Sequence, residues 1–242
     1  MTGSSRGLGN TLAKALASAG ARVILHGRDL KSLNSAANEW ENIYGVRPDT
    51  TLFDVQDADS VESAVKELIE KFGTPDILVN NAGIQRRAPF SEFPISDWND
   101  IIATNLSSVF YVSRFIVPHM ILRGSGKIIN IASVQSELGR QTIAPYAASK
   151  GGVALLTRGM TADLARHNIQ VNTLSPGYFA TDMNSALVAD ENFTAWLEQR
   201  TPAGRWGRPE ELAGTLIFLA SSASNFVTGQ NIFVDGGMTA VV

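Results

Sequence analysis

The sequence predicts a doubly wound parallel α/β fold in a single domain. Apolar, β-branched runs typical of buried parallel strands alternate with longer helical segments along all 242 residues. A glycine-rich segment precedes the first helix, and short polar or glycine-containing turns follow several strands. Right-handed crossovers between successive strands place the helices on both faces of one sheet. No linker or change in composition divides the chain, so we expect one domain over residues 1–242.

The individual elements follow from local patterns. Strands are expected at the short apolar runs 22–26, 51–53, 76–79, 127–131, 170–174 and 232–234. Helices are expected at about 7–18, 30–44, 58–72, 97–122, 146–166 and 210–220. Ser96 is a suitable N-cap for the fourth helix, and Pro118 is expected to bend that helix. The polar, aromatic-containing stretch 178–205 interrupts the alternation.

Composition excludes several classes of function. The net charge of −3 is dispersed and offers no basic stripe to nucleic acid. The chain has no cysteine, which excludes disulfides and thiol catalysis, and its three histidines lack metal-ligand spacing and are interpreted as structural. We identify no apolar run of the roughly 18 residues that a membrane span needs and no secretory leader. We therefore expect a cytoplasmic protein without a metal site or a membrane segment.

Three residues form a candidate catalytic constellation. Tyr146 and Lys150 are four residues apart at the start of an expected helix, so their side chains share one face. A nearby ammonium stabilises a phenolate, and we expect Lys150 to lower the Tyr146 pKa from its ordinary value near 10. Ser133 follows the strand 127–131, at the edge where open α/β sheets bind ligands. For the Tyr-Lys pair alone, a solvated helix surface is the competing interpretation.

The N-terminal glycines predict a phosphate-binding loop. In the run Thr2-Gly3-Ser4-Ser5-Arg6-Gly7-Leu8-Gly9, the spacing Gly-x-x-x-Gly-x-Gly differs from the usual Gly-x-Gly-x-x-Gly dinucleotide fingerprint. Gly3 permits a tight turn, while Gly7 and Gly9 let backbone amides approach a pyrophosphate closely. A flexible surface turn is the alternative. No Gly-Lys-Ser/Thr follows, which disfavours hydrolysis of a nucleoside triphosphate.

These motifs occur together in a fixed order. The glycine loop is followed by Asn80-Asn81-Ala82-Gly83, Asn105, the constellation of Ser133, Tyr146 and Lys150, and Ser175-Pro176-Gly177. On these residues, the chain resembles the short-chain dehydrogenase/reductase family over essentially its whole length. The resemblance implies reversible hydride transfer between nicotinamide and a carbinol carbon, and assembly as a homo-oligomer, either a tetramer or a dimer. Tyr146 would be the acid/base, Lys150 would also bind the nicotinamide ribose, and Ser133 would position the substrate oxygen.

The resemblance also assigns cofactor contacts. They are Gly3, Ser5, Arg6, Gly7, Leu8, Gly9, Arg28, Asp54, Val55, Asn81, Ala82, Gly83, Tyr146, Lys150, Pro176, Gly177 and Thr181. Asp54 would accept a hydrogen bond from the adenine amine. In the family, Asn105 belongs to the catalytic set through a water chain that leads to the lysine. A purely structural asparagine that ties the helix to a strand is the competing interpretation.

The end of the strand at 22–26 favours NADP over NAD. Relatives that prefer NAD generally carry an acidic residue there, whereas this chain has Gly27 followed by Arg28. A carboxylate would repel a 2′-phosphate by about 4 kcal/mol per charge pair at 4 Å and an effective dielectric of 20. Arg28, and Arg6 from the glycine loop, instead offer guanidinium groups suited to phosphate. Arg6 facing only solvent is the alternative.

The substrate expectation rests on four stretches, which are residues 80–90, 133–140, 176–183 and 200–207. They resemble the sugar-acid oxidoreductases of the family, and imply interconversion of D-gluconate and 5-keto-D-gluconate beneath a lid at about 178–205. A 2-deoxygluconate or another sugar acid is the alternative. Arg87 and Arg140, ranked above Arg86, could hold the carboxylate bidentately. The competing interpretation is that two of these three arginines are solvated or form ion pairs within the chain. Gln135 and Glu137 could meet hydroxyl groups.

One feature departs from the family pattern. Family members begin with an apolar strand at the sheet centre before the glycine loop, whereas this sequence starts at Met1-Thr2. We expect that strand to be lacking. Either the true start lies upstream, or the chain is a truncated, non-catalytic product that keeps only its assembly surfaces. Unpaired buried backbone groups cost roughly 1–3 kcal/mol each, so residues 1–242 alone are expected to be poorly soluble or to fail to bind NADP.

Overall fold

The computed structural model describes residues 1–242 and has the doubly wound α/β architecture that the sequence predicts. Its strands are β1 (Ile24–Gly27), β2 (Asp49–Leu52), β3 (Ile77–Asn80), β4 (Gly126–Ile131), β5 (Ile169–Pro176) and β6 (Asn231–Val234). Its α-helices are α1 (Gly7–Ser18), α2 (Leu30–Tyr44), α3 (Ala58–Phe72), α4 (Ile95–Ile102), α5 (Ser108–Arg123), α6 (Ala144–Leu164), α7 (Ser185–Val188), α8 (Glu191–Arg200) and α9 (Ala213–Ala220). The expected fold class is therefore confirmed.

All strand pairs are parallel, and they form two groups. β1 pairs with β2, and the other strands pair in the order β3-β4-β5-β6. No strand lies between β1 and β3, as expected from the sequence. Instead, three backbone hydrogen bonds connect the first residues to both groups: Met1 N to Ile24 O, Ser4 N to His26 O and Thr2 N to Val79 O. The glycine loop is thus held between the two groups.

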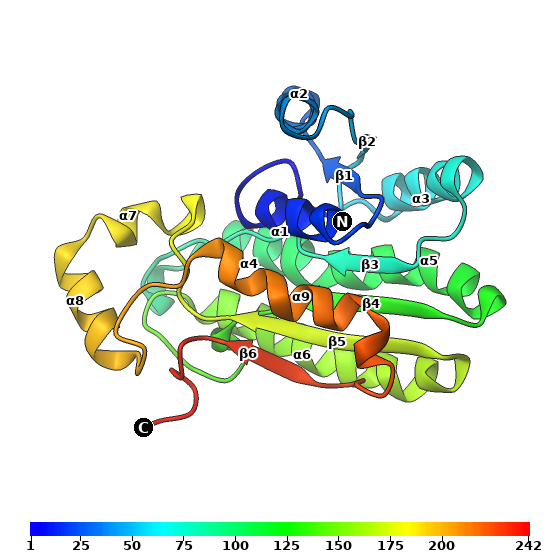
Figure 1. The fold of residues 1–242 in the computed structure, drawn as a ribbon. Coiled ribbons are helices and arrows are strands. Elements are labelled where there is room, and N and C mark those ends of the chain that lie inside the picture. The colour runs from blue at the N-terminus through cyan, green and yellow to red at the C-terminus, as the bar shows by residue number, and fades with distance from the viewer.

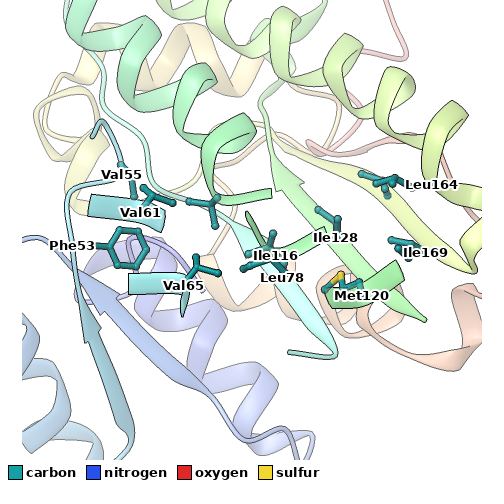
Figure 2. Packing of buried hydrophobic residues seen from close by; sticks show 12 residues of the cluster. Phe53, Val55, Val61, Val65, Leu78, Ile116, Met120, Ile128, Leu164 and Ile169 are labelled. Atoms are coloured by element: carbon teal, nitrogen blue, oxygen red, sulfur yellow. The ribbon is translucent and has the colours of Figure 1, made fainter. Parts of the chain in front are cut away.

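Helices cover both faces of the larger sheet (Figure 1). α1 and α9 pack together on one face, and α5 and α6 lie on the other. Alternate residues along a strand enter opposite cores because strand side chains alternate between faces. Ile128 packs with Val61, Val65 and Ile116 in the core beneath α3 and α5 (Figure 2). Its neighbour Ile129 belongs to the core beneath α1 and α9.

The helix expected at 97–122 is divided. α4 ends at Ile102, a π-helical turn spans Ala103–Ser107, and α5 continues to Arg123. Pro118 lies inside α5 without ending it. Pro94, rather than Ser96, is the N-cap of α4. The π-turn contains Asn105, and turns of this kind recur at functional sites.

The sequence expectation about apolar runs is wrong in one respect. By length and composition, the 29-residue helical segment Ile95–Arg123 is long and apolar enough to cross a membrane. Within its most apolar window, 44% of the residues are buried inside the fold. α5 packs against α3, β3 and β4. The segment is accounted for as a core helix of this domain.

The stretch 178–205 folds into α7 and α8 after β5. In Figure 1 these helices project beyond one end of the sheet, away from the strands. Asp190 caps α8 by accepting hydrogen bonds from the amides of Asn192 and Phe193. Leu197 is fully buried and packs with Val134 and Met238. The segment is therefore a packed helical cover and is attached to the body through few core contacts.

Candidate active site

The glycine loop is a close-packed turn. Gly3 has φ of +61°, and a Cβ atom there would lie 2.9 Å from Ala82 Cα. A Cβ atom at Gly9 would overlap the carbonyl oxygen of Gly3. Asn81 Nδ2 donates to the carbonyl oxygens of Thr2 and Gly3, both at 3.0 Å. The loop is fixed against the end of β3, which rules out the flexible surface turn.

A buried histidine supports the same loop from β1. The Gly3 amide donates to His26 Nδ1 at 2.9 Å, and His26 Nε2 lies 3.1 Å from the Phe53 carbonyl oxygen. A neutral ring with its proton on Nε2 satisfies both contacts. Burial, followed by the nearby N-terminal ammonium, lowers the pKa of His26 to about 4. The structural interpretation of His26 is therefore supported, and the ring specifically anchors the turn at Gly3.

A cavity of about 760 Å³ lies beside the glycine loop. It is lined by Ser5, Arg6, Gly7, Leu8, Asn10, Thr11, Lys31, Ser32, Ser35, Ala36, Glu39, Ala180, Thr181, Asp182 and Pro209. Arg6 and Lys31 bring positive charge to it, and neither forms an ion pair within the chain. The sequence analysis did not identify Lys31, although its position in the first turn of the helix expected at 30–44 can be read from the sequence.

These features fit a dinucleotide that carries an additional phosphate. The close approach at Gly3 and Gly9 brings the backbone against the N-terminus of α1, which favours a pyrophosphate. The cations of Arg6 and Lys31 suit a further phosphate. The Asp29 carboxylate is held by the amide and hydroxyl of Ser32, as the cap of α2. Arg28 is exposed and is not among the residues that line the cavity.

Of the other expected cofactor residues, some lie at the cavity and others have side chains buried in the core. Thr181 lines the cavity with Ala180 and Asp182. A Cβ atom on Gly177 would lie 2.7 Å from Asp235 Cα, so only glycine fits this passage after β5. The side chain of Val55 is buried in the core beneath α3 and does not face the cofactor, in contrast to the expectation. Only the backbone of Val55 can contact the adenine.

The remaining expected cofactor residues lie at the ends of strands. Asp54 is half-buried, and its carboxylate accepts a hydrogen bond from the Gln56 amide at 2.9 Å. Pro176 ends β5 and is buried. Leu8 packs against the core beneath α1 and α9. A methyl group at Gly83 would lie 3.7 Å from Lys150 Nζ, which places this glycine against the catalytic constellation.

Asn105 acts as a tie between α4–α5 and the segment after β3. Its Oδ1 accepts from the Ile84 amide at 2.8 Å, and its Nδ2 donates to the Ile84 carbonyl oxygen at 2.9 Å. Nδ2 also donates to Ser149 Oγ at 3.1 Å. Both amide hydrogens are used inside the protein. The geometry favours the structural interpretation over a direct role in a water chain.

The structure brings Ser133, Tyr146 and Lys150 together. Lys150 is 4% exposed, and its Nζ lies 5.7 Å from the centre of the Tyr146 ring. Ser133 caps a short 3₁₀ turn, and its Oγ accepts a hydrogen bond from the Gln135 amide at 3.2 Å. A hydrogen bond from Ser133 acts to lower the Tyr146 pKa. A serine hydroxyl, a phenol and an ammonium therefore converge at the carboxyl end of β4.

The expected lowering of the Tyr146 pKa is not present. Burial raises the pKa of Tyr146 to about 12, because desolvation outweighs the hydrogen bond from Ser133. Burial also lowers the pKa of Lys150 to about 8. The causes of the shift at Tyr146 are burial, the hydrogen bond from Ser133 and the charge of Tyr178, and Lys150 is not among them. Without ligands, the site therefore holds a protonated phenol beside an ammonium whose charge is disfavoured.

Of the three candidate arginines, two lie near each other and the third lies near a carboxylate. Arg86 Nε lies 3.9 Å from Asp97 Oδ1 on α4. Arg87 is close enough to Arg140 for the second charge to lower its pKa, after the larger effect of burial. Neither Arg87 nor Arg140 has an ion-pair partner in the chain. Two like charges that converge without a counter-ion form a suitable anion site.

A backbone contact explains how these two arginines meet. The Ala88 amide donates to the Thr142 carbonyl oxygen at 3.1 Å, which joins the segment after β3 to the loop before α6. Thr142 has φ of +69°, a left-handed conformation that β-branched residues rarely adopt. Strained backbone of this kind clusters at ligand sites. The loop that carries Arg140 is thus held in an unusual conformation against the segment that carries Arg87.

An aromatic cluster covers this side of the site, and sequence reasoning did not identify it. Tyr178 lies 5.7 Å from Phe193, 6.2 Å from Trp196 and 5.9 Å from Trp206, measured between ring centres. The Arg140 guanidinium stacks over Phe193 at 4.5 Å. Phe193 and Trp196 belong to α8, so the helical cover meets the anion site through this cluster. The separate positions of the four aromatic residues gave no local signal of it.

Comparison with known proteins decides the family. A family model described as enoyl-(acyl carrier protein) reductase matches residues 3–239. The chain is 56% identical to gluconate 5-dehydrogenase of Gluconobacter oxydans (strain 621H), covering 99% of this chain and 93% of that protein. The chain belongs to the short-chain dehydrogenase/reductase family. The family resemblance that the sequence motifs suggested is thereby confirmed.

Two further comparisons place the chain within the short-chain dehydrogenases/reductases. It is 52% identical to 5-keto-D-gluconate 5-reductase of Escherichia coli (strain K12), covering 100% of this chain and 95% of that protein. A crystal structure of gluconate 5-dehydrogenase from Burkholderia cenocepacia J2315, in complex with NADP and tartrate, superposes with a TM-score of 0.96. Identity to it is 54%, with 100% of this chain and 94% of that chain covered. The chain is an oxidoreductase of this family.

Proposed function

We propose that the chain is an NADP-dependent oxidoreductase that reversibly interconverts D-gluconate and 5-keto-D-gluconate. The observation that carries this proposal is a pair of arginines without counter-ions, Arg87 and Arg140, which Tyr178 and its aromatic cluster connect to the acid/base Tyr146. A site that combines an acid/base with an anion anchor suits a carbonyl compound with a carboxylate. The similarity to proteins named for gluconate and 5-keto-D-gluconate supports this substrate class.

The residues around the glycine loop support NADP as the cofactor. Arg6 and Lys31 are available to the additional phosphate, and the Asp29 carboxylate is engaged in capping α2. Gly27 leaves no carboxylate at the last position of β1, where a carboxylate would repel the 2′-phosphate. A relative at 54% identity was crystallised with NADP, which supports the same choice over NAD. The bound nicotinamide supplies or takes up the hydride.

The protein's part in the reaction is proton transfer and charge stabilisation. With its pKa near 12, Tyr146 holds its proton at neutral pH and can donate it to the substrate oxygen as a carbonyl is reduced. Ser133 Oγ would hold the same oxygen and stabilise the charge that develops on it. Lys150 would bind the nicotinamide ribose and stabilise the phenolate that remains on Tyr146. In the reverse direction, this phenolate accepts the alcohol proton.

We propose that the segment 178–205 acts as the substrate lid. Its helix α8 carries Phe193, which stacks on the guanidinium of Arg140, so the cover and the anion anchor are in contact. A substrate carboxylate that binds Arg140 would change this stacking. Closure of such a cover excludes water, which strengthens the electrostatic interactions within the site.

We further propose a cytoplasmic homo-oligomer, either a tetramer or a dimer. The helices on one face expose large apolar side chains, among them Phe110, Leu122 and Leu155, which are 51%, 86% and 67% exposed. Such side chains are the usual content of a subunit interface. The similarity to this family supports assembly. Light scattering on the purified protein, with the wild-type chain compared with a Leu155→Glu variant, measures the oligomeric state.

A substrate and cofactor panel tests the proposal. Initial rates are measured with D-gluconate, 5-keto-D-gluconate and 2-deoxygluconate, each with both nicotinamide cofactors. We expect the highest kcat/KM for the gluconate pair with NADP(H), and a higher value for 2-deoxygluconate would favour that alternative. A thermal-shift measurement with NADP separates an enzyme from a truncated, non-catalytic product. A ligand at 100 times its Kd stabilises by about 2.7 kcal/mol, whereas such a product shows no shift.

A further inference from the structure

A buried amide beside the catalytic constellation lacks a partner. Gln135 is 7% exposed, yet its Oε1 accepts no hydrogen bond within the protein. Its Nε2 reaches only the Tyr178 hydroxyl, at 3.5 Å, which is at the long limit for a hydrogen bond. Buried polar groups in folded proteins are nearly always paired, so an exception indicates a missing partner.

The position of Gln135 separates it from the other unpaired buried side chains. Those are Asn80, Thr173, Arg200 and Thr201. Asn80 belongs to a closed network in the sheet centre, where it donates to Ser113 and Asn130. Gln135 alone among the five hydrogen-bonds to a member of the constellation, because its backbone amide donates to Ser133 Oγ at 3.2 Å. Gln135 is therefore the one residue of the five that stands beside the serine expected to hold the reacting oxygen.

The neighbours of Gln135 define which part of a substrate it meets. On one side is Ser133, which would hold the reacting oxygen. On the other side is Tyr178, whose ring lies 5.7 Å from Phe193, the residue over which the Arg140 guanidinium stacks. Gln135 thus lies between Ser133 and the aromatic cluster that contacts Arg140, one of the two arginines of the expected carboxylate anchor.

We infer that Gln135 binds a hydroxyl group on the substrate carbons between the reacting carbonyl and the carboxylate, at C3 or C4 of 5-keto-D-gluconate. This inference rests on the proposed function. A hydroxyl group both donates and accepts, so it satisfies the amide whichever of its two ends faces the substrate. A methylene group satisfies neither end. Gln135 is then a specificity-determining residue that selects polyhydroxylated acids over their deoxy analogues.

The physical basis of the selection is the cost of leaving the amide unpaired. With the full substrate, the hydroxyl supplies the bond that the protein lacks. With an analogue deoxygenated at the same carbon, the amide stays orphaned in a site from which bound substrate has excluded water. Such a loss is expected to lower kcat/KM about 10- to 100-fold.

The test combines a variant with deoxygenated substrates. Gln135→Met keeps the side-chain length and removes both hydrogen-bonding groups. We expect it to lower kcat/KM for 5-keto-D-gluconate about 10- to 100-fold. For either the 3-deoxy or the 4-deoxy analogue, Gln135→Met should then have a kcat/KM equal to or above that of wild type, because the variant leaves no amide unpaired. Gln170→Met is the matched control, since Gln170 is also 7% exposed but lies near the start of β5.

The outcomes separate the inference from the proposed function. If wild type does not turn over 5-keto-D-gluconate, the proposed function is wrong and the inference falls with it. If wild type is active and Gln135→Met slows the full and both deoxy substrates equally, only the inference is overturned. Should Gln135→Met fail to fold, the inference is tested by comparing the kcat/KM of wild type for 5-keto-D-gluconate and for the two deoxy analogues. Equal kcat/KM for 5-keto-D-gluconate and both analogues overturns the inference, and a selective loss with one analogue supports it.

Discussion

Lys150 Nζ donates a 2.7 Å hydrogen bond to the carbonyl oxygen of Ile131. Ile131 is the last residue of β4 and stands two positions before Ser133. The bond therefore fixes the helix that carries Tyr146 against the strand that presents Ser133. Lys150 therefore has two roles, because its ammonium supplies charge to the site and its hydrogen bond holds α6 against β4.

Tyr146→Phe is expected to abolish turnover in both directions, because it removes only the hydroxyl group that carries the exchangeable proton. Positioned acid-base groups contribute about 10²–10⁴-fold, so the variant should retain less than about a tenth of the rate. Cofactor affinity, measured by fluorescence titration, should be nearly unchanged. Tyr44→Phe, on the exposed end of α2, is the control. A Tyr146→Phe enzyme with a substantial rate would remove Tyr146 from the mechanism.

Lys150→Met is expected to slow the reaction, weaken NADP binding and stabilise the ligand-free protein. The folded-state pKa of Lys150 is lowered from 10.5 to about 8 by burial, so the wild type bears the cost of a buried charge below pH 8. This cost is relieved as pH rises from 8 to 10.5, where the unfolded chain binds the proton more tightly than the folded one. Removal of the charge should stabilise by about 1–3 kcal/mol at pH 7, offset in part by the loss of the bond to Ile131.

Two measurements check this prediction. Calorimetry at pH 7 should give a Tm several degrees higher for Lys150→Met, since 1 kcal/mol corresponds to roughly 2–4 °C at this chain length. Titration should give weaker NADP affinity. Lys66→Met, on the exposed face of α3, controls for the general effect of replacing a lysine. Unaltered NADP affinity would argue against contact of Lys150 with the ribose, and a lowered Tm would argue against the buried-charge cost.

Gly27→Asp combined with Arg28→Ile is expected to shift preference from NADP toward NAD by at least about tenfold, as attraction for the 2′-phosphate becomes repulsion. A Cβ atom on Gly27 would lie 3.2 Å from Ser5 Oγ, so the loop must adjust slightly. The measured quantity is the ratio of kcat/KM for the two cofactors. Because Arg28 does not line the cavity, Lys31→Gln is the companion variant. If only Lys31→Gln changes the ratio, the phosphate lies on α2 instead of β1.

The local signals in the sequence were enough to define most of the fold. The limits of α1, α2 and α3 were predicted to the residue, because capping is local. Asp29 and Asp57 accept hydrogen bonds in the first turns of α2 and α3, and Gly45 ends α2 in a left-handed conformation. Strand ends shifted by one or two residues, since pairing with neighbours decides them.

The parts of the site that escaped prediction depend on distant contacts. The amide of Asn105, in the π-turn, pairs with Ile84 and Ser149, which are 21 and 44 residues away. The raised pKa of Tyr146 results from burial by the assembled fold, whereas the Tyr-Lys spacing alone indicated the opposite direction. Spacing along a helix fixes which groups meet, and the surrounding elements fix how much water reaches them.

Arg87→Gln and Arg140→Gln are expected to raise KM for 5-keto-D-gluconate at least about tenfold, since a bidentate contact with the carboxylate is lost. KM for an uncharged ketose should change much less in the same variants. Arg86→Gln is the matched control, because Arg86 pairs with Asp97 instead of facing Arg140. The idea of an anion anchor fails if all three variants treat charged and uncharged substrates alike.

Acid is expected to destabilise the protein through His26, at the turn that holds the glycine loop. Burial lowers the folded-state pKa of His26 from 6.5 to about 4. Between these values the unfolded chain binds a proton that the folded chain does not, so stability present above pH 6.5 is lost as pH falls toward 4. Protonation would also remove the acceptor that receives the Gly3 amide. The expected loss of stability is on the order of 3 kcal/mol, at 1.36 kcal/mol per pKa unit.

Urea unfolding of wild type and His26→Gln at pH 7, 6, 5 and 4 measures this loss of stability. The variant should be less stable at pH 7 and show a flatter dependence, with His167→Gln as the control. Parallel pH profiles for wild type and His26→Gln would show that His26 is not the titrating group.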